Sequence, residues 1–133
     1  MTGNLGERQA ALVAALVAGG PLPPGFDPAR LAATRRALLR KRAADAARLW
    51  PLLAASLGAD WPRVFAAHRD GHEPVGALRD GWDVAVALRE CGELAASAAA
   101  ELAGREATMR YDGRGAPRRR SLAGRAMAAL RRR

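Results

Sequence analysis

The chain has 133 residues and a mass of 14.0 kDa, which is enough for one small domain. Half of its residues are hydrophobic and 5% are aromatic, and its one cysteine, Cys91, excludes a disulfide within the chain and a cysteine zinc cluster. A lone cysteine fits a reducing compartment, so we expect a cytoplasmic protein. No stretch is apolar enough, long enough and free enough of Gly and Pro to predict a transmembrane segment. The run from Gln9 to Gly20 is interpreted as an ordinary first helix rather than as a signal peptide.

The charge is distributed unevenly along the chain. The net charge is +9, and residues 114–133 carry eight of these positive charges, because they contain eight arginines and no acidic residue. We therefore predict a nearly neutral helical domain over residues 1–112 and an arginine-rich, partly helical tail over 113–133. Such a tail attracts phosphates, anionic surfaces or acidic proteins, although a merely solvated terminus stays open as an alternative. The predicted anion-binding residues of the tail are Arg114, Arg118, Arg119, Arg120 and Arg125.

Helix signals dominate from the start of the chain. Apolar residues at helical spacing predict a first helix over Glu7–Ala18. Asp27 is expected to cap a second helix that begins at Pro28, a residue that suits the first helical position. This helix should run to about Leu49, because Pro51 disfavours helical geometry in the residue before it.

Several shorter elements are predicted in the remaining chain. A third helix over Leu52–Leu57 is followed by a fourth, which begins after Asp60. Asp80-Gly81 is expected to break the chain, and a long fifth helix should then run from about Trp82 to Arg110. A weak sixth helix is expected in the tail, on Leu122, Ala126 and Leu130. The predicted fold class is all-α, a single compact bundle of about five helices with a basic C-terminal tail.

The second helix contains an unusual combination of charge and apolar character. On a helical wheel, Arg35 and Arg42 lie within the arc of its apolar residues. Guanidinium groups on an apolar face need partners. They form internal ion pairs, with Asp83 or Glu90 as possible acids, or extend their long stems outward to solvent, or belong to a docking strip for an acidic or carboxylate-bearing partner. In the last case the positive ridge along the border of the strip would consist of Arg36, Arg40 and Lys41.

We predict no active site and no metal or cofactor site. His68 and His72 are four residues apart, but Gly71 ends the helix between them and no further ligand is evident nearby. Cys91 falls on the apolar face of the predicted fifth helix, where a buried, unreactive thiol is expected. The chain shows no nucleophile with a base, no glycine-rich phosphate loop and no carboxylate pair in a perturbing environment.

An ordered series of residues resembles the helical N-terminal domain of a bacterial family labelled "putative DNA-binding domain". An arginine-bearing helix, an aromatic-Pro, a Leu-Gly, a His-Pro element and a Gly-aromatic follow one another. The family's His-Pro-Pro-like element is His72-Glu73-Pro74 here, Thr34 replaces a tyrosine, and we expect no second, strand-containing domain. The series consists of Leu31, Arg35-Arg36, Leu38-Leu39, Leu49-Trp50-Pro51, Leu57-Gly58, Trp61, Phe65-Ala66, His68, His72-Glu73-Pro74, Leu78, Gly81-Trp82 and Leu88.

The resemblance implies a function as a partner protein. Members of that family include the partner subunits of multinuclear non-haem iron enzymes that modify ribosomally made peptides, as in methanobactin pathways. This chain would then be a non-catalytic accessory subunit that docks on such an enzyme and helps to present its precursor peptide. The partner-binding residues implied are Arg35, Arg36, Leu39, Arg42, Trp61, His72 and Trp82. The alternative is a nucleic-acid-binding helical module that acts through its arginine-rich tail, with binding that falls steeply with salt.

Overall fold

Helices make up nearly all the regular structure in the computed structural model, which describes residues 5–17, 25 and 27–131. The all-α prediction is confirmed. One short hairpin accompanies the helices: β1 (Met109–Arg110) pairs antiparallel with β2 (Arg118–Arg119), with Met109 opposite Arg119. The helices are α1 (Leu5–Val17), α2 (Pro28–Leu49), α3 (Pro51–Leu57), α4 (Trp61–Arg69), α5 (Ala77–Glu90), α6 (Ala96–Thr108) and α7 (Leu122–Arg131), with a 3-10 turn, η1, at Gly58–Asp60.

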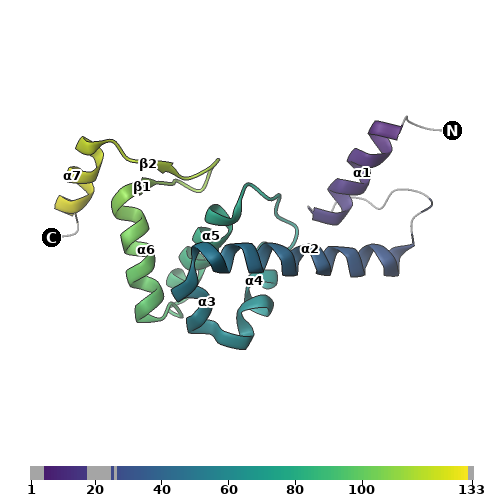
Figure 1. Ribbon diagram of the computed structural model, residues 1–133, viewed down its shortest axis with the longest axis horizontal. Helices are drawn as coiled ribbons and strands as arrows, with labels where there is room; N and C mark the ends of the chain where they lie inside the picture. The colour runs from purple at the N-terminus through teal and green to yellow at the C-terminus, as the bar shows by residue number, and fades with distance from the viewer. Residues whose placement is uncertain (1–4, 18–24, 26, 132–133) are drawn as a thin grey trace.

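The long helix α2 organises the molecule. Its first turn is capped as predicted, since the Ala29 amide donates to Asp27 Oδ1 at 2.9 Å and Pro28 occupies the first turn. Its C-terminal half packs against α4 and α5, and α1 lies along its N-terminal half (Figure 1). The helix ends at Leu49, before Pro51, as predicted.

The core is built around three tryptophans on different elements. Trp50 has no exposed surface, meets Trp82 edge to face with ring centroids 5.8 Å apart, and donates from Nε1 to the Leu78 carbonyl at 3.0 Å. Trp61 donates from Nε1 to the Ala43 carbonyl at 2.8 Å. Both indole groups thus satisfy their N–H inside the core, which fixes the positions of their rings. The cluster comprises Ala43, Ala46, Trp50, Leu53, Trp61, Phe65, Trp82, Val84, Ala85, Leu88, Ala98 and Leu102.

The predicted fifth helix, Trp82–Arg110, is wrong as a single element. The chain forms α5 and α6 instead, separated by a turn at Gly92, whose φ is +74°. The Gly92 amide donates to the Arg89 carbonyl and the Glu93 amide donates to the Leu88 carbonyl, which is the Schellman pattern of helix ends. As a result Cys91 lies at the end of α5 and is exposed, so the prediction of a buried thiol is also wrong.

The expected break at Asp80-Gly81 is wrong as well. Both residues are buried inside α5, and Gly81 lies directly against the indole of Trp50. A glycine is needed there because a side chain would collide with the ring. Gly81, which suggests a turn in the sequence, is therefore required by the packing of the core against Trp50.

The end of the chain packs onto α6. The Arg120 amide donates to the Thr108 carbonyl at 2.8 Å, and Arg120 Nε donates to the Glu106 carbonyl at 3.0 Å. The weak helix predicted in the tail is confirmed as α7, which contacts α6 and lies at the opposite end of the molecule from α1 (Figure 1). Within the described ranges, no helix combines the length and apolarity needed to cross a membrane. Ala18 and Gly20, where the first helix was expected to end, lie outside the described residues.

Candidate functional site

A buried ion-pair network joins α2, α4 and α5. At its centre is Asp80, whose side chain is 3% exposed. Its Oδ1 accepts from Arg42 Nη2 at 2.9 Å and from Arg69 Nε at 3.1 Å, and its Oδ2 accepts from Arg42 Nε at 3.2 Å. One carboxylate therefore binds guanidinium groups from two helices, one of them in the two-pronged geometry that arginine favours.

Asp83, one turn later, extends the network to the segment after α6. Arg69 Nη1 lies 3.1 Å from Asp83 Oδ2, and the Tyr111 hydroxyl donates to Asp83 Oδ1 at 2.6 Å. Burial and the neighbouring Asp83 raise the pKa of Tyr111 to about 12. Arg79 lies over the Tyr111 ring at 5.7 Å, with its Nε 3.5 Å from Asp83 Oδ2. Burial by itself would lower the pKa of Arg79. The nearby Tyr111 and Asp83 outweigh this effect, so the pKa of Arg79 is raised.

The network holds three helices together. Arginines bind both of its carboxylates, Asp80 and Asp83. Across the described part of the chain, no group of three or more His, Cys, Asp and Glu residues could hold a metal ion. A buried ion pair contributes little net stability when compared with apolar packing, but it strongly penalises any arrangement that separates its members. The network therefore fixes how α2 is rotated against α4 and α5.

The predicted partner-binding residues are divided between the interior and the surface. Trp61 and Trp82 are buried in the core, and Arg42 is 11% exposed and bound to Asp80. Both helix arginines pair with acids of the same chain, Arg42 in the interior and Arg35 at the surface, and the suggested acids, Asp83 and Glu90, are wrong. Arg42 uses Asp80, and Arg35 forms a surface pair with Asp70 at 2.6 Å.

The remaining predicted partner-binding residues lie at or near the surface. Leu39 is partly buried and packs against the core. His72 is exposed, and its backbone carbonyl accepts from Arg42 Nη1 at 3.0 Å, which anchors the loop after α4. Arg36 is exposed on the outer side of α2.

The outer side of α2 is a cationic face, which we define as Arg36, Arg40 and Lys41. All three side chains are exposed, and none forms a salt bridge with any residue that the structure describes. The exposed alanines Ala37 and Ala44 lie on the same side of the helix, so little bulk stands between the charges.

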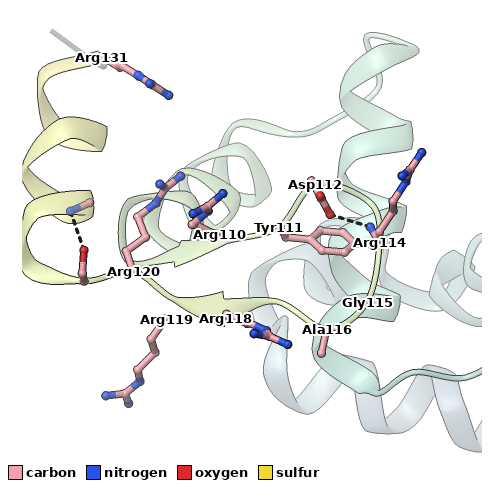
Figure 2. A pocket seen from close by; sticks show the side chains of 12 residues that line it. Arg110, Tyr111, Asp112, Arg114, Gly115, Ala116, Arg118, Arg119, Arg120 and Arg131 are labelled. Atoms are coloured by element: carbon pink, nitrogen blue, oxygen red, sulfur yellow. Dashed lines mark hydrogen bonds between the residues drawn. The ribbon is translucent and has the colours of Figure 1, made fainter.

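A second basic surface lies between the hairpin and α7. It is a hollow of about 930 Å³, surrounded by arginines from β1, β2, the loop that joins them and α7 (Figure 2). Of the predicted tail residues, Arg114, Arg118, Arg119 and Arg120 line this hollow, and Arg125 is exposed elsewhere on α7. We call it the arginine hollow, and its charged lining residues are Arg110, Asp112, Arg114, Arg118, Arg119, Arg120 and Arg131.

Comparison with known proteins identifies the family. The model of the SCO6045-like C-terminal domain matches residues 6–90, which include α1 to α5 and the ion pairs of Asp80. The chain belongs to this family. It is also similar to a UPF0276 protein of Streptomyces avermitilis, with 41% identity over 90 residues, which is 67% of this chain. The match covers 18% of that relative, so the chain spans less than a fifth of its length. No solved structure matches the chain.

The family match ends with α5, so it includes the cationic face of α2 and excludes the arginine hollow. It also includes two network residues that sequence analysis missed, Arg69 and Asp80. Helical spacing was the signal that could have found them. Arg69 follows Phe65 by four residues, and Asp80 precedes Val84 by four, so each lies on the buried face of its helix.

Proposed function

We propose that this protein is a non-catalytic accessory subunit that docks on a multinuclear iron-dependent enzyme and helps to present a ribosomally made precursor peptide. Such a subunit would work in the cytoplasm, where the precursor is made. The observation that carries the proposal is the relation to the Streptomyces relative. There, the matching segment is less than a fifth of a much longer chain, the arrangement expected of a domain that works beside another one.

The described surface of the helical domain supports a docking role. The cationic face of α2 is exposed and forms no salt bridge with the residues that the structure describes. It lies opposite the side of α2 that the ion pair between Arg42 and Asp80 holds against the core. Because that pair fixes the rotation of α2, the backbone positions from which the three charges project are set before any partner binds. A preorganised surface loses less conformational entropy on binding, so more of the contact energy appears as affinity. An acidic surface of the enzyme is the complementary partner.

The proposal is tested by co-expression with the product of the neighbouring gene, as the candidate enzyme. Size-exclusion chromatography would compare the intact chain, a variant with Arg36→Ala, Arg40→Ala and Lys41→Ala, and a variant with Arg114→Ala, Arg118→Ala and Arg119→Ala. The two triple variants remove the same number of charges. We expect co-elution to be lost with the α2 variant and kept with the tail variant.

The peptide-modifying reaction supplies a second measurement. The enzyme should convert its precursor peptide at least tenfold faster with the wild-type chain than with the α2 variant, while the iron content of the enzyme stays the same. A complex that needs the tail arginines, or an equal rate without the chain, would overturn the proposal.

A further inference from the structure

The arginine hollow concentrates positive charge, and no ion pair among the described residues neutralises its arginines. Six arginines and a single acid, Asp112, line it. Asp112 is itself engaged, because its Oδ1 accepts from the Arg114 amide at 2.9 Å. No salt bridge within the described residues involves any of the six arginines. Like charges around one concave surface reinforce each other's potential, so the hollow attracts anions strongly.

The positions of the arginines are set by the backbone around them. Arg110 and Arg118 are opposite each other in the hairpin, which brings the two strands' charges to the same place. Arg120 is half-buried and fastened to the Glu106 carbonyl through its Nε. Arg131, at the end of α7, points back toward the hairpin across the hollow (Figure 2). The charges therefore surround an extended space rather than a single point.

The chemistry of the lining selects the class of ligand. Among the described residues, no leucine, isoleucine, valine, methionine, phenylalanine or tryptophan lines the hollow, so an acidic peptide would find no apolar anchor on them. A planar membrane surface does not enter a concavity. Interfaces with nucleic acid are more polar and far more positive than those between proteins, and arginine pairs with phosphate in a two-pronged geometry. We propose that the arginine hollow binds the phosphate backbone of a nucleic acid.

The one aromatic residue of the lining indicates that bases are not recognised. Tyr111 donates its hydroxyl to Asp83, and its ring meets Trp82 edge to face with centroids 5.5 Å apart. A base would have to compete with these contacts to stack on it. The binding is therefore independent of sequence and rests on phosphate contacts. It is separate from the docking role proposed above, since the hollow and the cationic face of α2 lie on different elements.

The test uses the intact chain and a fluorescently labelled DNA oligonucleotide of mixed sequence, as a single strand and as a duplex. Fluorescence anisotropy would give the affinity at several salt concentrations for the wild type and for two double variants of equal charge. Arg118→Ala with Arg119→Ala alters the hollow, and Arg36→Ala with Arg40→Ala is the matched control on α2. Circular dichroism and the melting temperature would verify that both variants are folded.

The hollow variant should bind tenfold or more weakly than the control variant. Its plot of log affinity against log salt should also be shallower by about 0.7 to 0.9 for each arginine that contacts a phosphate. Equal losses in the two variants would show binding through general basicity and would overturn the proposal. The absence of DNA binding, or equally tight binding of poly-glutamate or phosphatidylglycerol vesicles in parallel assays, would overturn it too.

Discussion

Gly81 lies so close to Trp50 that a methyl group on its Cα would overlap Cδ1 of the indole ring. The contact joins α5 to the end of α2 at the centre of the core. Trp50 has no exposed surface and is held by a hydrogen bond to the Leu78 carbonyl, so the ring has no room to move aside. The helix accepts a glycine at this point because the tryptophan occupies the space of a side chain.

Gly81→Ala should therefore destabilise the protein, although alanine is the better helix former. Overpacking of a core costs about 1–3 kcal/mol, and each kcal/mol lowers the melting temperature of a chain of this size by about 3–5 °C. Gly104→Ala is the matched control, because Gly104 is helical and a Cβ there would meet nothing within 4 Å. That variant should gain about 0.5–1 kcal/mol. Thermal denaturation of both variants would check the pair, and a neutral Gly81→Ala would contradict the packing described here.

Asp80→Asn should be among the most destabilising conservative changes in the chain. It removes the carboxylate charge that Arg42 and Arg69 share and leaves two buried guanidinium groups without it, a loss of about 3–5 kcal/mol. Urea denaturation measures the effect. Glu106→Gln serves as the control because Glu106 pairs with Arg89 at the surface, where such pairs contribute about 0–1 kcal/mol. Similar losses in the two variants would mean that the Asp80 network is not a structural centre.

Local signals were sufficient to predict most helix boundaries. The limits of α2 depend on Asp27, Pro28 and Pro51, which act within a few residues of themselves, and the structure confirms them. The separation of α5 from α6 was missed, although Gly92 was a local signal for it. The apolar pattern that includes Cys91 continues past this glycine, so it predicts one helix where the chain forms two.

Long-range contacts explain the other differences. Asp80-Gly81 resembles a turn because the reason for both residues lies elsewhere: Trp50 is 31 positions from Gly81, and Arg42 is 38 positions from Asp80. The wheel of the second helix showed that Arg42 needed an acid, but it could not select one among those of a distant helix. The hollow was equally inaccessible to sequence reasoning, since a two-residue strand pair brings its arginines together.

The neutral hydroxyl of Tyr111 stabilises the folded protein, and this stabilisation is lost at strongly alkaline pH. The pKa of Tyr111 is raised to about 12 in the fold, whereas an exposed tyrosine has a pKa near 10. The unfolded chain therefore loses this proton first, and the folded state binds more protons between pH 10 and 12. The stability contributed by the neutral hydroxyl is fully present below about pH 10 and is lost as the pH rises toward 12.

This dependence can be measured without interference, because the chain contains one tyrosine. The phenolate absorbance of the native protein should titrate near pH 12 and that of the urea-unfolded protein near pH 10. Tyr111→Phe loses the hydrogen bond to Asp83 and should cost about 1–3 kcal/mol at neutral pH, as expected for a bond to a charged group. Its stability should then fall less steeply than that of the wild type above pH 10. A native titration near pH 10 would show that the hydroxyl is not held by Asp83.

Glu101 completes the start of α3 from a neighbouring helix. Trp50, at the N-cap position, offers no side-chain hydrogen bond, and the Leu52 and Leu53 amides donate to Glu101 Oε2 and Oε1 at 3.0 and 2.9 Å. A carboxylate here binds two free amides and also interacts favourably with the positive end of the helix dipole. Glu101 thus does for α3 what a local cap does for other helices, and it fastens α6 to α3.

Glu101→Ala should cost about 1–2 kcal/mol, as the loss of a helix cap does, and Glu101→Gln should cost less because an oxygen acceptor remains. Glu93→Ala is the control, since Glu93 is exposed and no side-chain hydrogen bond or ion pair of it is seen within the described chain. Urea denaturation would rank the three variants. Hydrogen exchange would locate the effect, because the Leu52 and Leu53 amides should lose protection in Glu101→Ala and keep it in Glu93→Ala. Unchanged protection of these two amides in Glu101→Ala would show that α3 is capped by other groups.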